Sequence, residues 1–320
     1  MRIAVVIAVY NGEKFIEKQL TSIYKQSRKA DEVIICDDGS NDNSVAIIND
    51  FITSRHLEAN WRLYRNAVNL GYIQNFYYAI SLSSAELIFL SDQDDLWRED
   101  KIEKMAAVFA AHPEVAVLSC NFGVIDENDQ PLHGFMIESS SLSEELESVS
   151  TDDILYSYRW PGMTMALRRS FFEETSSYYR QLSVPHDLIF ALFAAEKGCF
   201  FEYKYCGCDH RRHGNNTAGE EHRIKKLLNL RRKLTEMVHY EGILSELLAA
   251  DLPLLEGNKK IKAKHVFHQQ RMQLIRHRKL LSLLKLYGSY GTIRWKSLIC
   301  DVWLICFGND RNHTQVGEKQ

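Results

Sequence analysis

Three carboxylates follow one apolar run of this 320-residue sequence within four residues. The run at residues 86–90, "ELIFL", leads into "LSDQDDLW", which contains Asp92, Asp94 and Asp95. Carboxylates this close repel one another, and each is costly to hold at the edge of a core. Mg²⁺ and Mn²⁺ prefer oxygen ligands and typically take one or two protein carboxylates together with substrate phosphates. The cluster therefore suits the binding of a nucleotide with a divalent metal, and the metal would offset the repulsion.

Polar residues also follow the other apolar runs of the N-terminal half: Tyr10 and Asn11, then Asp37 and Asp38, then Asn69 and Gly71. Each group alone also fits an ordinary turn, since Asp and Asn cap helices and Gly permits tight turns. In an open parallel sheet, ligands bind beyond the carboxyl ends of the strands. Several polar groups at one such edge indicate a nucleotide site, where a carboxylate such as Asp37 would accept the imide N–H of uracil or thymine.

Alternating strands and helices are predicted to position these groups. Apolar runs predict strands at residues 2–10, 32–40, 61–66 and 86–90, and helical spacing predicts helices at 12–27, 41–54, 73–84 and 100–112. This alternation is typical of βαβ units and a mostly parallel α/β sheet flanked by helices. Further along, we expect strands at 115–126, 162–172 and 199–214, a helix at 186–198, and a mobile Ser- and Glu-rich loop at 135–153.

Charge divides the chain into two expected domains, residues 1–220 and 221–320. The first carries 20 Lys and Arg against 33 Asp and Glu, and the second carries 19 against 9. The second is Leu-rich, basic and helical in pattern. It is predicted either to pack as a subdomain or oligomer contact, or to bind an anionic membrane surface. No nucleic-acid partner is expected.

Composition narrows the class of protein. Apolar and charged residues make up 45% and 25% of the chain, as in an ordinary globular protein. The N-terminus lacks signal-peptide features, and no run approaches the roughly 20 apolar residues that span a bilayer. Seven cysteines without a CxxC pair predict reduced thiols. We therefore expect a cytoplasmic protein, peripheral at the inner face of the membrane. The absence of GxxxxGK[ST] and of GxGxxG after the first strand argues against ATP hydrolysis and dinucleotide redox chemistry.

Together, "VVIAVYNGEKF", "VIICDDGSNDNS", "NLGYIQNF" and "LSDQDDLW" resemble the inverting family 2 glycosyltransferases of the GT-A fold, and most of all the bacterial rhamnosyltransferases. The resemblance covers about residues 1–220. It implies that Asp92 and Asp94 hold Mn²⁺ or Mg²⁺ and the donor diphosphate. It also implies that Asp37 and Asp38 lie near the nucleoside, with Tyr10 beside the base.

Two later segments fit the same resemblance. In "VPHDLIFAL" it implies that Asp187 is the general base, although a helix cap is the simpler interpretation of that residue alone. In "HRRHGNNTAG" it implies that His213 lies near the metal or diphosphate, while Arg211 and Arg212 supply positive charge for the leaving group. The resemblance also places Trp160 and His186 near the acceptor.

The predicted reaction is transfer of L-rhamnose from dTDP-β-L-rhamnose, with inversion, to a hydroxyl of a surface polysaccharide or lipid-linked oligosaccharide. The donor identity rests on the resemblance, and a UDP-hexose or UDP-galactofuranose is the alternative. A sugar-nucleotide pyrophosphorylase would need a Gly-rich, Arg-bearing loop after the first strand, and "VYNGEKF" is not one. An inactive scaffold of a polysaccharide assembly complex is the non-enzymatic alternative, but it would tolerate loss of acids that are all present.

Overall fold

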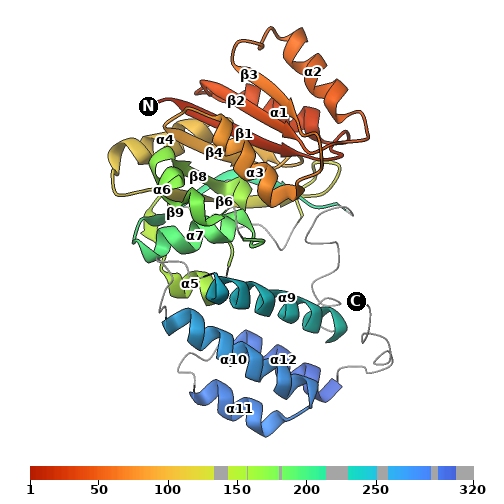
Figure 1. Ribbon diagram of the computed structural model, residues 1–320, viewed down its shortest axis with the longest axis vertical. Helices are drawn as coiled ribbons and strands as arrows, with labels where there is room; N and C mark the ends of the chain where they lie inside the picture. Colours follow the sequence, from red (N-terminus) through yellow and green to blue (C-terminus); the bar gives the residue numbers. More distant parts are fainter. Residues whose placement is uncertain are drawn as a thin grey trace. The chain divides into compact units, whose positions relative to one another are not determined.

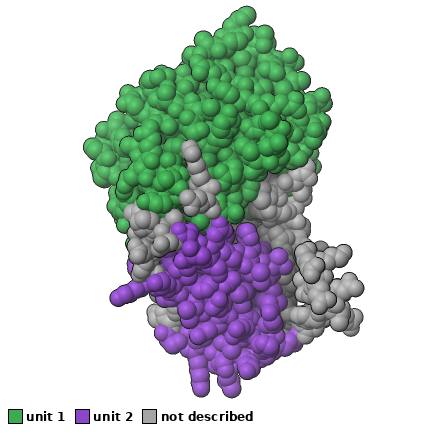
Figure 2. All heavy atoms as spheres, in the orientation of Figure 1, with its two compact units in different colours: residues 1–217 green, residues 218–320 purple. Residues whose placement is uncertain are grey.

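The computed structural model describes residues 1–132, 143–156, 158–179, 182–213, 230–250, 259–289 and 295–307. The chain forms two compact units, Met1–Thr217 and Ala218–Gln320, which Figure 2 colours separately. Each unit is described by itself below.

The first half of unit 1 is the predicted parallel sheet. Its strands are β1 (Ile3–Val9), β2 (Glu32–Asp37), β3 (Trp61–Arg65) and β4 (Leu87–Ser91), in the order β3-β2-β1-β4 (Figure 1). All neighbouring pairs among them are parallel. The connecting helices are α1 (Ile16–Tyr24), α2 (Ser44–Ser54) and α3 (Gly71–Leu82), and α4 (Lys101–Ala111) follows β4. Ile3 to Ile7 have no exposed surface, as expected of a strand covered on both faces. The predicted α/β class is confirmed.

The second half of the sheet is mixed in direction. Strand β8 (Met165–Arg168) lies antiparallel between β4 and β6 (Val117–Ile125), and β9 (Phe200–Arg211) runs parallel to β6. The two-residue strand β5 (Leu96–Trp97) pairs antiparallel with β9, with Leu96 opposite Asp209. This pairing brings the loop after β4 against the carboxyl end of β9.

Two predictions for unit 1 are corrected by the structure. Residues 169–172, predicted as strand, begin helix α6 (Arg169–Tyr179), whose buried Phe171, Phe172, Thr175 and Tyr179 recur at helical spacing. Part of the predicted mobile loop is ordered as β7 (Leu146–Ser148), which pairs with β9, and as the start of α5 (Thr151–Tyr156). Ser150 precedes α5, and its N–H and hydroxyl donate to Asp153 Oδ2 at 3.0 and 2.6 Å, a pairing typical of a helix start. Residues 133–142 lie outside the described part.

Unit 2 is helical, with α9 (Leu230–Ala249), α10 (Lys259–Arg276), α11 (Leu280–Ser289) and α12 (Trp295–Phe307). Helix α10 contacts the other three (Figure 1). Their shared core contains Met237, Phe267, Leu283, Tyr287 and Leu304, among others. Inside it, Arg271 binds Asp301 through two hydrogen bonds of 2.5 and 2.7 Å. Among the described residues of both units, no helix is long and apolar enough to cross a membrane.

Candidate active site

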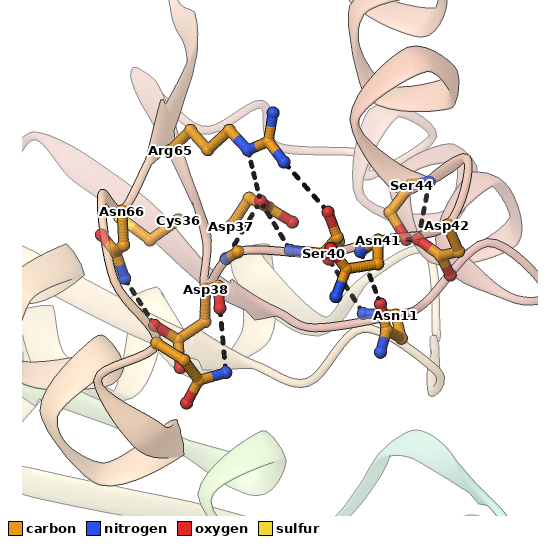
Figure 3. A network of polar contacts seen from close by, with 12 residues as sticks. Asn11, Cys36, Asp37, Asp38, Ser40, Asn41, Asp42, Ser44, Arg65 and Asn66 are labelled. Atoms are coloured by element: carbon orange, nitrogen blue, oxygen red, sulfur yellow. Dashed lines mark hydrogen bonds and ion pairs between the residues drawn. The ribbon is translucent and has the colours of Figure 1, made fainter.

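Asp37 ends β2 with one carboxylate oxygen bound and the other unpartnered. Oδ2 accepts the N–H groups of Gly39 at 3.2 Å and Ser40 at 3.1 Å, a turn that requires the positive φ of Gly39, +82° (Figure 3). The Arg65 Nε lies 3.5 Å from the same oxygen. Oδ1 is buried and has no hydrogen-bond partner among the described residues. An unmet buried acceptor is costly, so the Oδ1 of Asp37 is suited to receive an N–H from a ligand.

Asp38 directs its carboxylate at the start of α3. Its Oδ1 accepts the N–H of Leu70 at 2.8 Å and its Oδ2 the N–H of Gly71 at 2.9 Å. The Asn69 side chain donates to the Asp38 carbonyl at 2.9 Å, and Gly71 has a positive φ of +77°. The structure therefore uses Asp38, Asn69 and Gly71 to build the turn beside Asp37. Their predicted contact with the nucleoside stays a prediction.

Tyr10 and Asn11 join the ends of three strands. The Asn11 N–H donates to Ser40 Oγ at 2.9 Å, which ties β1 to the turn after β2. The backbone of Tyr10 binds the Gln93 side chain twice, donating to Oε1 at 2.8 Å and accepting from Nε2 at 3.1 Å. A Cβ on Gly12 would lie 2.4 Å from Gln93 Oε1, so this approach needs glycine. The Tyr10 ring is half exposed beside this junction, and sequence reasoning had assigned no role to Gln93.

The acids after β4 meet two histidines from the end of β9. The Asp94 Oδ2 lies 2.8 Å from His213 Nε2, and the Asp95 Oδ1 lies 3.0 Å from His210 Nδ1. Burial, followed by the charges of neighbouring acids, raises the pKa values of both Asp92 and Asp94. Raised pKa values are expected of carboxylates that lie close together, and a bound cation would lower these pKa values again.

His210 balances the acids. Burial acts to lower the pKa of His210, but the hydrogen bond and charge of Asp95, with Asp92 and Asp94, outweigh it and raise the pKa. The neighbouring acids therefore favour the protonated form of the His210 imidazole. Sequence reasoning assigned His210 no role at this site. Its pairing with Asp95 depends on the β5–β9 register, which the local sequence does not reveal.

Arg211 is fully buried and binds protein groups. Its Nε donates to the Asp94 carbonyl at 2.8 Å, and its Nη1 donates to the Asp126 carbonyl at 3.0 Å. Nη1 also lies 2.5 Å from Asp129 Oδ1. These contacts make Arg211 a positioning residue for the acid loop. The backbone N–H of Arg212 donates to the Ile125 carbonyl at 2.8 Å. The predicted contacts of both residues with the leaving group stay predictions.

Asp187 lies in the first turn of α7 (His186–Glu196), while Pro185 occupies the N-cap position. Asp187 Oδ2 accepts the Gly162 N–H at 3.2 Å, and Oδ1 accepts the Leu188 N–H at 2.8 Å. Asp187 is therefore not the N-cap residue, although its carboxylate accepts a first-turn N–H of the helix, and its predicted role as general base stays a prediction. The charge of Asp187 also contributes, after burial and the nearer acids, to the raised pKa of Asp92.

Two tyrosines flank Asp187. Burial, with the charges of Asp187 and Asp92, raises the pKa of Tyr72, so the Tyr72 hydroxyl lies close to both acids. Burial of its hydroxyl and the charge of Asp187 likewise raise the pKa of Tyr158, which donates to the Trp160 carbonyl at 2.5 Å. Asp187 and Asp92 thus face one site from α7 and from the loop after β4. Sequence reasoning missed both tyrosines.

His186 and Trp160, the predicted acceptor contacts, lie in the interior. His186 is 4% exposed and stacks on Phe76 with ring centres 4.1 Å apart. Burial lowers the pKa of His186, so its ring is neutral, and neither ring nitrogen has a hydrogen-bond partner in the described part of the chain. Trp160 is 2% exposed and packs edge-on against Phe200 at 5.6 Å. An unmet His186 nitrogen suits a ligand hydroxyl, whereas the Trp160 ring has a packing role; acceptor binding by either stays a prediction.

The donor set at the acid cluster fits a divalent cation shared with a substrate. Among the described residues, no three His, Cys, Asp or Glu side chains gather as a metal-binding group. Mg²⁺, however, is usually bound through one or two carboxylates plus substrate phosphates, so a complete protein cage is not required. The Asp94 carboxylate, with His213 beside it, could supply such a ligand. The buried Asp95 Oδ2 has no hydrogen-bond partner among the described residues.

Comparison with known proteins identifies the family of this chain. The model of the family "Glycosyl transferase family 2" matches residues 4–174. An uncharacterized glycosyltransferase of Nostoc sp. is 29% identical over 150 residues, which cover 47% of this chain and 45% of that protein. The dTDP-rhamnosyl transferase RfbG of Shigella flexneri is 36% identical over 108 residues, 30% of this chain and 34% of RfbG. The O-antigen chain rhamnosyltransferase RfbN of Salmonella typhimurium is 25% identical over 228 residues, 69% of each. The chain thus spans less than half of the Nostoc relative.

Two solved structures share the fold. S. aureus TarS in complex with UDP has a TM-score of 0.56 at 19% identity, with 83% of this chain and 71% of that chain covered. The mannosyltransferase PcManGT of Pyrobaculum calidifontis, in complex with GDP-Man and Mn²⁺, has a TM-score of 0.52 at 17% identity, with 95% and 86% covered. At these identities the likeness concerns the fold alone. Because the family model covers more than half of the sequence, this chain belongs to the family 2 glycosyltransferases.

Proposed function

We propose that this glycosyltransferase moves L-rhamnose from dTDP-β-L-rhamnose to an acceptor hydroxyl, with inversion at the anomeric carbon. The acceptor is a growing surface polysaccharide or lipid-linked oligosaccharide at the inner face of the cytoplasmic membrane. The observation that carries the proposal is the placement of Asp187 in the first turn of α7, where two backbone N–H groups orient its carboxylate and its charge acts on Asp92. The names of the relatives RfbG and RfbN support rhamnose as the sugar.

The nucleotide would enter along the sheet edge. The unpartnered Asp37 Oδ1 would accept the imide N–H that thymine and uracil share, and the half-exposed Tyr10 ring would lie beside the base. Asp38 and Asn69 would hold the turn that borders the nucleoside. This chemistry favours a dTDP or UDP donor, so the base alone does not choose between rhamnose and the UDP sugars.

The diphosphate would lie at Asp94 and His213. These two side chains, with Asp92 and Asp95 nearby, would hold Mn²⁺ or Mg²⁺ together with the phosphate oxygens. When bound, the cation neutralises the negative charge that develops on the departing nucleoside diphosphate. Arg211 would keep the Asp94 backbone in place, and the cationic His210 would limit repulsion between the acids and the phosphates.

The acceptor hydroxyl would lose its proton to Asp187. That residue would lie on the side of the sugar away from the diphosphate, and one displacement from the face opposite the leaving group inverts the configuration. The Gly162 N–H and the Leu188 N–H orient the Asp187 carboxylate. His186, with its unmet ring nitrogens beside Gly162, would receive a second hydroxyl of the acceptor.

One assay tests the donor and the reaction together. The full chain would be incubated with a lipid-linked acceptor, Mn²⁺ or Mg²⁺, and dTDP-β-L-rhamnose, UDP-glucose or UDP-galactofuranose, and release of the nucleoside diphosphate would be measured. The matched control is dTDP-glucose, which shares the nucleotide but differs in the sugar. We expect release from dTDP-β-L-rhamnose and an α-linked product. Release from UDP donors alone would overturn the choice of rhamnose, and a β-linked product would overturn inversion.

A further inference from the structure

One stretch of unit 2 combines positive charge with exposed leucine. Residues 257–300 contain 11 Lys and Arg and no Asp or Glu. One of these cations, Arg271, forms an ion pair with Asp301 inside unit 2. The remaining charge includes a dense group, Arg276, Arg278 and Lys279, at the turn between α10 and α11, where all three side chains are exposed.

Helix α11 carries apolar side chains on two opposite sides. Leu283 and Tyr287 face inward, with 0% and 3% exposure, and pack in the core of unit 2. Leu281 and Leu284, three residues apart and therefore neighbours on one helical face, are 76% and 42% exposed. The core of unit 2 contains Leu283 and Tyr287, whereas Leu281 and Leu284 do not pack in that core.

Cations border the exposed leucines on both sides. Lys279 precedes Leu281 at the start of α11, and Lys285 follows Leu284 one position later; both lysines are exposed. We call residues 276–285 the basic leucine corner. Apolar side chains surrounded by Lys and Arg are the pattern of helices that lie in the interface of an anionic membrane. The charges approach the lipid phosphates while the leucines enter the boundary of the acyl chains.

We propose that the basic leucine corner docks this protein on an anionic lipid bilayer, with Leu281 and Leu284 inserted and Lys279 and Lys285 against the headgroups. Charge complementarity selects this occupant: the sequence has no acidic residue over these 44 positions, so the exposed cations of the corner attract anionic lipid and repel another copy of the corner. The inference rests on the proposed membrane location and is independent of the sugar transferred.

Vesicle flotation of the full chain tests the proposal. Vesicles would contain phosphatidylcholine alone or phosphatidylcholine with phosphatidylglycerol, at low salt. We expect binding to the anionic vesicles, little binding to the neutral ones, and release as salt rises. Lys279→Glu with Lys285→Glu should weaken binding roughly 30-fold or more, since each basic residue near the surface contributes about a fivefold factor. Leu281→Asp with Leu284→Asp should weaken binding by about tenfold or more, because the leucines no longer insert.

Matched variants separate the corner from general effects. Val238→Asp changes an apolar residue of α9 that is 51% exposed, and Lys25→Glu reverses an exposed lysine of unit 1. Both should bind vesicles as the unaltered protein does, and far-UV circular dichroism checks that all variants fold. Equal binding by the corner and control variants would overturn the proposal, as would an absence of binding to anionic vesicles.

Two further measurements keep the outcomes apart. Light scattering reports whether the protein forms a dimer and whether Leu281→Asp abolishes it. If the variant loses a dimer but still binds vesicles as the unaltered protein does, the corner serves self-association and the lipid proposal is overturned. Nucleoside diphosphate release with a soluble acceptor reports on transfer alone. The corner variants should keep that activity, so failure of the membrane inference and failure of the proposed reaction give different results.

Discussion

The Asp187 carboxylate accepts the backbone N–H of Gly162 at 3.2 Å, which ties the start of α7 to the 3₁₀ turn η2 (Gly162–Thr164) before β8. The N-cap position of α7 belongs to Pro185, and this carboxylate also accepts the N–H of Leu188 in the first turn of the helix. Two N–H groups orient it, and the charge of Asp187 reaches Asp92 across the site. This relationship is the basis of the first prediction.

Asp187→Asn should lower kcat by roughly 10²–10⁴-fold, the usual contribution of a general base. Asn keeps the size and one of the two acceptor oxygens, but its NH₂ group cannot accept the other N–H and cannot take a proton from the acceptor hydroxyl. Donor binding should change little, because the donor is bound elsewhere. The matched control is Glu17→Gln, which neutralises an acid in the first turn of α1. Steady-state kinetics with both substrates makes the comparison, and a fully active Asp187→Asn enzyme would end the assignment.

Asp94→Ala should abolish transfer, and activity should require a divalent cation. The substitution removes the carboxylate that faces His213 at 2.8 Å and leaves the diphosphate near Asp92 and Asp95. Nucleoside diphosphate release would be measured with excess chelator and then across a Mn²⁺ titration. Asp50→Ala, at an exposed position of α2, serves as the control and should titrate like the unaltered enzyme. Full activity in excess chelator would contradict the metal assignment.

Asp37→Asn should weaken donor binding, whereas Asp38→Asn should lower the stability of the protein. In Asp37→Asn the amide oxygen can keep the bonds to Gly39 and Ser40, which leaves the NH₂ group where the unpartnered Oδ1 stood. An N–H would then face the imide N–H of thymine or uracil. We expect the donor KM to rise roughly tenfold or more while the melting temperature stays close to that of the unaltered enzyme, since an unmet hydrogen bond costs about 1–3 kcal/mol.

In Asp38→Asn both native oxygens already accept N–H groups, from Leu70 and Gly71. One oxygen becomes an NH₂ group that opposes a donor, so the turn before α3 loses about 1–3 kcal/mol of stability. Thermal unfolding and donor KM, measured on both variants, form the test. A destabilised Asp37→Asn protein with unchanged donor KM would contradict the proposed contact of Asp37 with the base.

The sequence predicted the features that depend on neighbouring residues and missed those that depend on distant pairing. Strand β1 could be predicted because Ile3–Val9 is apolar throughout, and a strand buried on both faces needs that pattern. The contact of Asp95 with His210 could not, because it follows from the pairing of Leu96 with Asp209 across more than 100 residues. The burial of Trp160 could not be predicted either, since Phe200, which packs against it, comes from the distant strand β9.

Helix α6 shows a different limit. Its first residues, Arg169 and Ser170, directly follow β8 (Met165–Arg168), and the apolar Phe171 and Phe172 come next, so the sequence resembles a continued strand. Only the later Thr175 and Tyr179 complete the helical spacing. Likewise, β7 has the exposed sequence of a loop, and its pairing with β9 makes it a strand.

Unit 2 contains a buried histidine that should make its stability depend on pH. His268 on α10 is 4% exposed, and its Nε2 lies 3.0 Å from the Met237 carbonyl. Burial lowers the pKa of His268 to about 4; the Met237 carbonyl and Glu241 of α9 act to raise it, and Arg271 and Lys264 of α10 act to lower it. The ring of Tyr240, also on α9, packs edge-on at 5.1 Å.

The direction of the effect follows from proton binding. In the unfolded chain a histidine has a pKa of about 6.5, so between about pH 6.5 and pH 4 the unfolded state binds the proton and the folded state does not. The stability contributed by neutral His268 is therefore complete above about pH 6.5 and decreases as the pH falls towards 4. The total loss over that range is on the order of 3 kcal/mol.

Hydrogen exchange of α9 and α10 peptides in the full chain, measured at several pH values from about 4.5 to about 7.5, would follow the stability of unit 2 directly. His268→Gln should flatten the pH dependence, because Gln can donate to the Met237 carbonyl but does not titrate. The control is His239→Gln, at an exposed position of α9, which should keep the dependence of the unaltered protein. If protection in α9 and α10 fell equally with acid in both variants, His268 would not be the responsible group, and the neutral buried state assigned to it would be wrong.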